Sequence, residues 1–145
     1  MSVRVRVSRR VQLPAAEVTG FAMDTSRLFP CFAGVARFEP AGPDADGELW
    51  DIHLRVGSYE VGSRVAVRRT APAELEWESV RGARNQARLW VEPVGADESL
   101  VHVVLKFHLD GRILARTAML LARGILTRHV EAGLENLRHK LEFGD

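Results

Sequence analysis

The 145-residue sequence has little from which a disulfide, a metal site or a membrane span could be built. Cys31 is its only cysteine, which excludes an internal disulfide and any cysteine-rich metal site. No apolar run reaches the roughly 18–20 residues that a membrane-spanning helix requires. The formal net charge is only +1, so the composition indicates neither a nucleic-acid partner nor an acidic one.

Recognisable catalytic motifs are also missing. No glycine-rich phosphate loop follows a predicted strand, and no nucleophile elbow or Cys–His signature occurs. The sequence has five histidines, but their predicted positions are too far apart for one metal ion. We therefore expect no metal, no cofactor and no catalytic histidine. The chain begins with an alternating strand and not with a signal peptide, so we expect a cytoplasmic protein.

The longest predicted element is a helix from Asp110 to Leu141. Strong helix formers dominate this stretch, and it contains no proline. Asp110 is a suitable N-cap, and Gly144 lies where such a helix would stop. Apolar residues recur along it at spacings of three, four and seven, namely Met119, Leu126, Val130, Leu134, Leu137 and Leu141.

The first half of this helix is apolar around most of its circumference. Residues 113–126 therefore need cover on more than one side, from the sheet and its loops, from a second copy in a homodimer, or from a ligand. Gly124 and Gly133 are unfavourable in a helix interior. Each indicates a bend or the close approach of another group, or is simply tolerated.

The remainder of the chain predicts an antiparallel meander in a single domain, residues 1–145. A strand over 3–13 is followed by two short helices, one over 14–23 and one over 24–32, the second shortened or bent by Pro30. A loop is expected over 40–47 because Asp46-Gly47 is a turn signal. The six later strands are expected over 35–39, 48–56, 59–70, 74–80, 86–94 and 99–109.

Four stretches resemble turn and packing signatures of one superfamily. Leu13–Val18 resembles its "aPAeeV" entry into the first helix, and Asp24–Phe32 lies where its second helix lies. Arg69–Trp77 resembles its "p-rl-w" hairpin. Glu92–Val101 resembles its "eP-g-gT-v" turn, with Glu98-Ser99 in place of the usual Gly-Thr. The chain is thus similar to the START-like, polyketide cyclase/dehydrase and lipid-transport (SRPBCC) superfamily.

This resemblance implies an α+β helix-grip fold, in which an antiparallel sheet of about seven strands (β-α-α-β6-α) wraps around a long C-terminal helix. It implies no universal catalytic residue. Members mostly hold hydrophobic molecules in a cavity between the sheet and the final helix, and some are aromatase/cyclases.

Strand parity predicts which side chains face that helix. One face is almost wholly apolar, and the other is a solvated face of mixed charge with His53, His102 and His108. The inward polar groups are few: Tyr59, Ser63, Ser79 and, where the first strand breaks parity, Arg9. Trp90 falls on the outer face, which indicates either a dimer contact or a register error of one residue.

These observations favour the binding of a hydrophobic small molecule (a lipid, polyketide or aromatic compound) between the helix and the sheet. The alternative for the large side chains is that they only fill the core. Other hypotheses are an aromatase/cyclase-like enzyme, with Tyr59 or Arg9 assisting proton transfer, and a protein-interaction module that uses the apolar helix half or Trp90. The expected ligand-binding residues are Phe29, Phe32, Trp50, Leu54, Tyr59, Ser63, Val65, Trp77, Leu89, Phe107, Met119 and Leu126.

Overall fold

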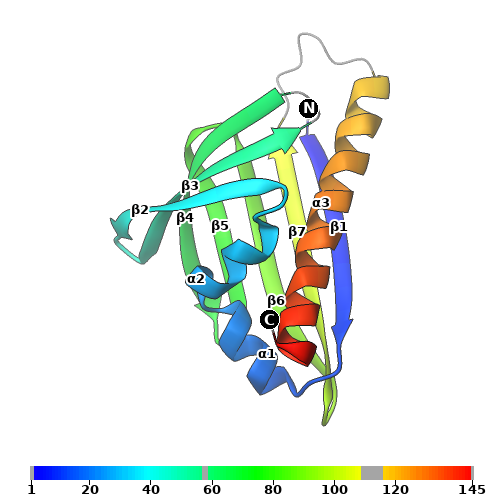
Figure 1. Ribbon diagram of the computed structural model, residues 1–145. Helices are drawn as coiled ribbons and strands as arrows, with labels where there is room; N and C mark the ends of the chain where they lie inside the picture. The colour runs from blue at the N-terminus through cyan, green and yellow to red at the C-terminus, as the bar shows by residue number, and fades with distance from the viewer. Residues whose placement is uncertain (1, 57–58, 109–115, 145) are drawn as a thin grey trace.

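One seven-stranded antiparallel sheet and one long helix make up most of the structure (Figure 1). The computed structural model describes residues 2–56, 59–108 and 116–144. The strands lie in the order β1-β7-β6-β5-β4-β3-β2. They are β1 (Ser2–Val11), β2 (Ala36–Asp44), β3 (Gly47–Val56), β4 (Tyr59–Ala71), β5 (Glu74–Gly82), β6 (Asn85–Gly95) and β7 (Glu98–His108). The helices are α1 (Ala15–Ala22), α2 (Thr25–Leu28), the 3-10 helix η1 (Phe29–Phe32) and α3 (Arg116–Phe143).

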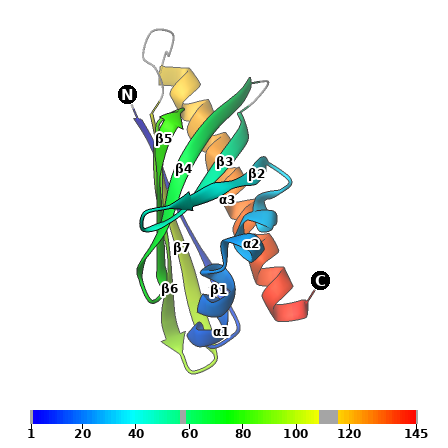
Figure 2. The ribbon, with the colours of Figure 1, turned by 90° about the vertical axis from the view of Figure 1, so that its left-hand side faces the viewer.

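The sheet curves around α3, as the helix-grip fold requires (Figures 1 and 2). α3 lies on one face of the sheet beside β1, and α1 and α2 lie at the end of the sheet where α3 finishes. The predicted cap Asp110 lies outside the described residues. The predicted helix end is two residues early: α3 continues to Phe143, and Gly144 follows it with a φ of 73° and donates its N–H to the carbonyl of Lys140.

The prediction of a loop over 40–47 is wrong for most of that range. β2 continues to Asp44, with a bulge between Pro40 and Gly42, and pairs with β3 along its length. β2 is an edge strand, so a proline whose N–H is missing can face the open side without loss of a ladder hydrogen bond. The second helix is divided as Pro30 predicts, into one α-helical turn and the 3-10 helix η1.

The apolar face predicted from strand parity is confirmed. β1 and β6 alternate between buried and exposed residues along most of their lengths, with the buried side toward α3. Trp90 lies on the outer face, so the predicted register is correct there. His102 was expected to be solvated on the outer face, but its side chain is largely covered and the residue is only 9% exposed. It is held between Ser8 (2.6 Å) and Glu92 (3.0 Å) and stacks on the ring of Trp90.

α3 is tied to the edge strand β1 through two arginines. Arg123 Nε donates to the carbonyl of Arg4 (3.3 Å). Arg9, which was expected to point into the cavity, reaches α3 instead and lies 3.4 Å from the carboxylate of Glu135. The reason is that α3 runs directly beside β1, so a long cation at the parity break meets the helix first. Both contacts help to cover the open edge of β1.

A second pair of contacts ties α3 to the opposite side of the fold. Asn136 Nδ2 donates to the carbonyl of Cys31 in η1 (2.8 Å). His129 Nε2 lies 2.9 Å from the carbonyl of Arg55 in β3 and must be the donor, since a carbonyl only accepts. α3 is therefore held on both sides of the space it covers. No helix among residues 2–56, 59–108 and 116–144 is long and apolar enough to cross a membrane.

Candidate functional site

A partly enclosed cavity of about 90 Å³ lies between α3 and the inner face of the sheet. Side chains from η1, β2, β3, β4, β5, β6, β7 and α3 surround it, because the curved sheet and the helix both direct their apolar faces into the same space. Of the twelve residues predicted to bind a ligand, seven line the cavity: Phe29, Phe32, Leu54, Ser63, Trp77, Phe107 and Leu126.

Of the other five predicted residues, three lie outside the lining and two have side chains outside the described part of the structure. Trp50, Val65 and Leu89 are buried in the same core without reaching the lining. Their side chains fill space between elements, which was the alternative hypothesis for large apolar residues. The side chains of Tyr59 and Met119 lie outside the described part of the structure.

Aromatic rings form one wall of the cavity. Phe29 stacks on Phe38 with ring centroids 4.5 Å apart, and its edge meets the ring of Trp77 at 5.8 Å. Phe32 is tilted against Phe38 at 6.3 Å. Such pairs fix one another's orientation and are worth about 0.5–1.5 kcal/mol each beyond the area they bury. The rings thus pack against one another, and they offer flat apolar surface to a ligand.

Gly133 explains how Phe32 reaches this wall. A Cβ on Gly133 would overlap the Cδ1 and Cε1 atoms of Phe32 and would stand 2.7 Å from Cζ. Optimal carbon–carbon separations are about 3.5–4.0 Å. The glycine thus allows the ring to lie directly against α3. Gly124 has no such role, since a Cβ added there would meet only Arg128 Nη1, at 3.9 Å.

Two polar residues of the lining were not predicted, Asn85 and His129. Asn85 was interpreted as a turn residue, although it shares the parity of the inward residues Ala87 and Leu89. His129 lies three residues after Leu126 in the apolar stripe of α3, a spacing that places both side chains on one helix face. Strand parity predicts the inward position of Asn85, and helix spacing predicts that of His129, when the two rules are applied to polar residues as well as to apolar ones. The expected set of inward polar groups therefore has to include His129.

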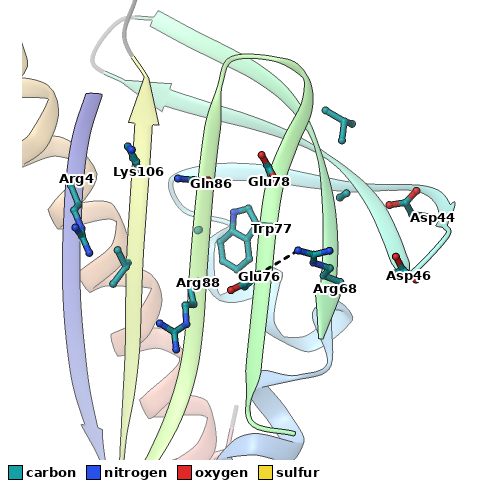
Figure 3. Close-up of a pocket in the computed structure, with 14 residues that line it drawn as sticks. Arg4, Asp44, Asp46, Arg68, Glu76, Trp77, Glu78, Gln86, Arg88 and Lys106 are labelled. Carbon is teal, nitrogen blue, oxygen red and sulfur yellow. Dashed lines mark ion pairs between the residues drawn. The ribbon is translucent and has the colours of Figure 1, made fainter. Parts of the chain in front are cut away.

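A second, larger hollow of about 500 Å³ lies on the opposite face of the sheet (Figure 3). Its lining carries charges of both signs: Arg4 and Lys106 lie on β1 and β7, Glu76 and Glu78 on β5, and Asp44 and Asp46 on the β2–β3 hairpin. The dashed line in Figure 3 is the Arg68–Glu76 ion pair of 3.8 Å. This hollow is water-accessible and unsuited to an apolar ligand.

Ion pairs shift acid–base equilibria on that outer face. Hydrogen bonds from Arg88 and Thr70 lower the pKa of Glu74, and a hydrogen bond from Arg64 lowers the pKa of Asp51. Both carboxylates are thereby kept ionised. Since the interacting groups remain partly open to solvent, such pairs contribute little to stability. Neither of these carboxylates lines the cavity under α3.

Cys31 is expected to be unreactive in the folded protein. It is 1% exposed, and burial raises its pKa, although Lys140 and a backbone hydrogen bond act in the opposite direction. The thiolate is the reactive form, so labelling should be slow. We expect 5,5′-dithiobis(2-nitrobenzoic acid) to label Cys31 only when urea unfolds the chain. Stoichiometric labelling within seconds in native buffer would contradict the burial of this thiol.

Comparison of the sequence with known families agrees with this architecture. The family described as polyketide cyclase / dehydrase and lipid transport matches residues 2–142. The chain therefore belongs to that family, within the START-like (SRPBCC) superfamily. A search of the curated proteins finds no match.

Solved structures show the same fold at low sequence identity. A START superfamily protein from Mycobacterium smegmatis is 18% identical, with a TM-score of 0.74, covering 95% of this chain and 98% of that one. The ZhuI aromatase/cyclase from Streptomyces sp. R1128 is 13% identical, with a TM-score of 0.79 and coverages of 98% and 94%. Norcoclaurine synthase from Thalictrum flavum, in complex with dopamine and hydroxybenzaldehyde, is 12% identical, with a TM-score of 0.69 and coverages of 95% and 85%.

Proposed function

We propose that this protein binds a compact hydrophobic molecule, about the size of one aromatic ring, in the cavity under α3. The observation that carries the proposal is an unfilled space lined by apolar side chains from the sheet and the helix, with only a few polar groups. Such a lining is typical of small-molecule sites. Burial of apolar ligand surface would supply most of the affinity, at about 25 cal/mol per Å².

The size of the cavity favours a small ligand over a lipid chain or a fused-ring polyketide. Pockets for drug-sized ligands commonly measure about 300–1,000 Å³, whereas this cavity measures about 90 Å³. An apolar cavity of about 150 Å³ in another protein holds benzene. A single ring would therefore fit here after a small outward shift of the lining, or with one edge at the mouth. The hydroxybenzaldehyde bound by norcoclaurine synthase is also a single-ring compound.

An NMR titration tests the proposal. We expect toluene, added to uniformly ¹⁵N-labelled protein, to shift the backbone amide signals of Phe107, Leu126 and Val130, which lie in the cavity lining. The amide signals of Asp44 and Asp46, in the outer hollow, serve as the control and should not move. A titration in which no signal shifts, or only the outer-face signals shift, would overturn the proposal.

A further inference from the structure

Among the described residues, the lining of the cavity carries no permanently charged side chain. None of the described residues around it is an aspartate, glutamate, lysine or arginine, and His129 is the one titratable group among them. An ion that leaves water for such a space loses its hydration without gaining a partner, which is strongly unfavourable. A ligand of this site is therefore bound in an uncharged form.

The side-chain amide of Asn85 is held in one orientation by hydrogen bonds, and this fixes the position of its acceptor oxygen, Oδ1. Its Nδ2 donates to Ser63 Oγ (2.9 Å) and to the carbonyl of Ala83 (3.0 Å), and its backbone N–H donates to Ser79 Oγ (3.0 Å). Ser63 Oγ donates in turn to the carbonyl of Ala83 (3.0 Å). The amide cannot rotate without losing both Nδ2 bonds, so the direction of its oxygen Oδ1 is set.

The oxygen of this amide lacks a partner. Asn85 is 9% exposed, yet Oδ1 accepts no hydrogen bond from any residue in the described part of the chain. The side chain has the inward parity of Ala87 and Leu89 and lines the cavity, and the residue also borders a smaller hollow at the β5–β6 turn. Oδ1 keeps some exposed surface, so it can accept a hydrogen bond from a ligand without breaking a bond within the protein.

The other polar groups of the lining are compatible with the same ligand. His129 uses its Nε2–H on the carbonyl of Arg55, so in the neutral ring Nδ1 is a second acceptor. Trp77 carries an indole N–H donor, and the residue borders both the cavity and the outer hollow. A hydroxyl group both donates and accepts, so it can satisfy an acceptor and a donor together.

We propose that the ligand is an uncharged, single-ring compound bearing a hydroxyl group, and that Asn85 selects it by accepting a hydrogen bond from the hydroxyl at Oδ1. The inference rests on the proposed function, because it assumes that the cavity binds a ring at all. Ser63 has a positioning role, since it holds the Asn85 amide in its orientation. The aromatic wall supplies the apolar surface against which the ring packs.

Three fluorinated probes with the same ring test this selection by ¹⁹F NMR at pH 7: 4-fluorotoluene, 4-fluorophenol and 4-fluorobenzoate. We expect 4-fluorophenol to bind about 3- to 10-fold more tightly than 4-fluorotoluene, the gain of one neutral hydrogen bond. We expect 4-fluorobenzoate, which is an anion at this pH, to bind more weakly than both. If none of the three binds, the proposed function fails. If 4-fluorotoluene binds as well as 4-fluorophenol, only the selection by Asn85 is overturned.

Variants of the acceptor complete the test. In Asn85→Leu the ratio of the phenol and toluene affinities should fall to about 1, and the retained affinity for 4-fluorotoluene shows within the same variant that the cavity persists. Ser63→Ala is a milder second change that frees the Asn85 amide without removing it, and it should lower the ratio part of the way. An unchanged ratio in either variant would overturn the role of Asn85.

Discussion

Gly133→Ala is expected to lower the free energy of unfolding by about 1–2 kcal/mol, although alanine is the better helix former. The added Cβ would overlap the ring of Phe32, which packs directly against α3 at this point. Relief requires the ring to move off the helix, and the empty space beside it is the cavity that Phe32 lines. Ring-sized ligands should therefore bind on the order of tenfold more weakly.

Gly124→Ala is the matched control, because it makes the same chemical change in the same helix. Its Cβ would meet nothing closer than 3.9 Å. This variant should be more stable than the natural protein by up to about 1 kcal/mol, and its ligand affinity should be unchanged. Urea unfolding measures both variants. Equal stabilisation by the two substitutions would show that Phe32 does not depend on Gly133.

Leu126→Ala should lower the free energy of unfolding by about 2–5 kcal/mol and should enlarge the site. Leu126 is 1% exposed and contributes to the cavity lining from α3. Its loss removes apolar contact and leaves extra space that adjoins the existing cavity. We expect the variant to bind a two-ring compound such as naphthalene more tightly than the natural protein does, as measured by the shift in unfolding temperature with ligand.

Leu137→Ala separates lost stability from gained space. Leu137 lies on the same helix and is 0% exposed, but it does not line the cavity. We expect a comparable loss of stability and no gain in naphthalene binding. A gain of the same size in both variants would mean that general loosening, and not room beside the cavity, admits the larger ligand.

Much of the fold could be predicted because each strand follows a simple rule. Alternation along β1 and β6 reports which face meets α3, and the apolar stripe from Leu126 to Leu141 reports the matching side of the helix. The β2–β3 hairpin was not predicted at its full length, for a physical reason. Pro40, Gly42 and Pro43 are loop formers locally, and only their position on an edge strand makes them tolerable within a sheet.

The site was harder to predict because the cavity volume is a small difference between two large volumes: the space enclosed by the sheet and α3, and the side chains that fill it. Trp50 and Leu54 share an inward parity, yet Trp50 fills the core and Leu54 lines the empty space. Their difference depends on packing against η1 and α3, which no pattern within one strand records. Asn85 and His129 were missed because turn and helix polar residues are usually solvated, and here tertiary packing turns both toward the cavity.

Anomalous diffraction from crystals grown with 4-bromophenol locates the ligand itself, since the bromine atom marks its position without prior assumptions. We expect one anomalous peak between α3 and the inner face of the sheet, next to the aromatic wall, with the hydroxyl group within hydrogen-bond distance of Asn85. A peak in the charged outer hollow, or no ordered bromine at a concentration at which binding saturates in solution, would contradict the proposal.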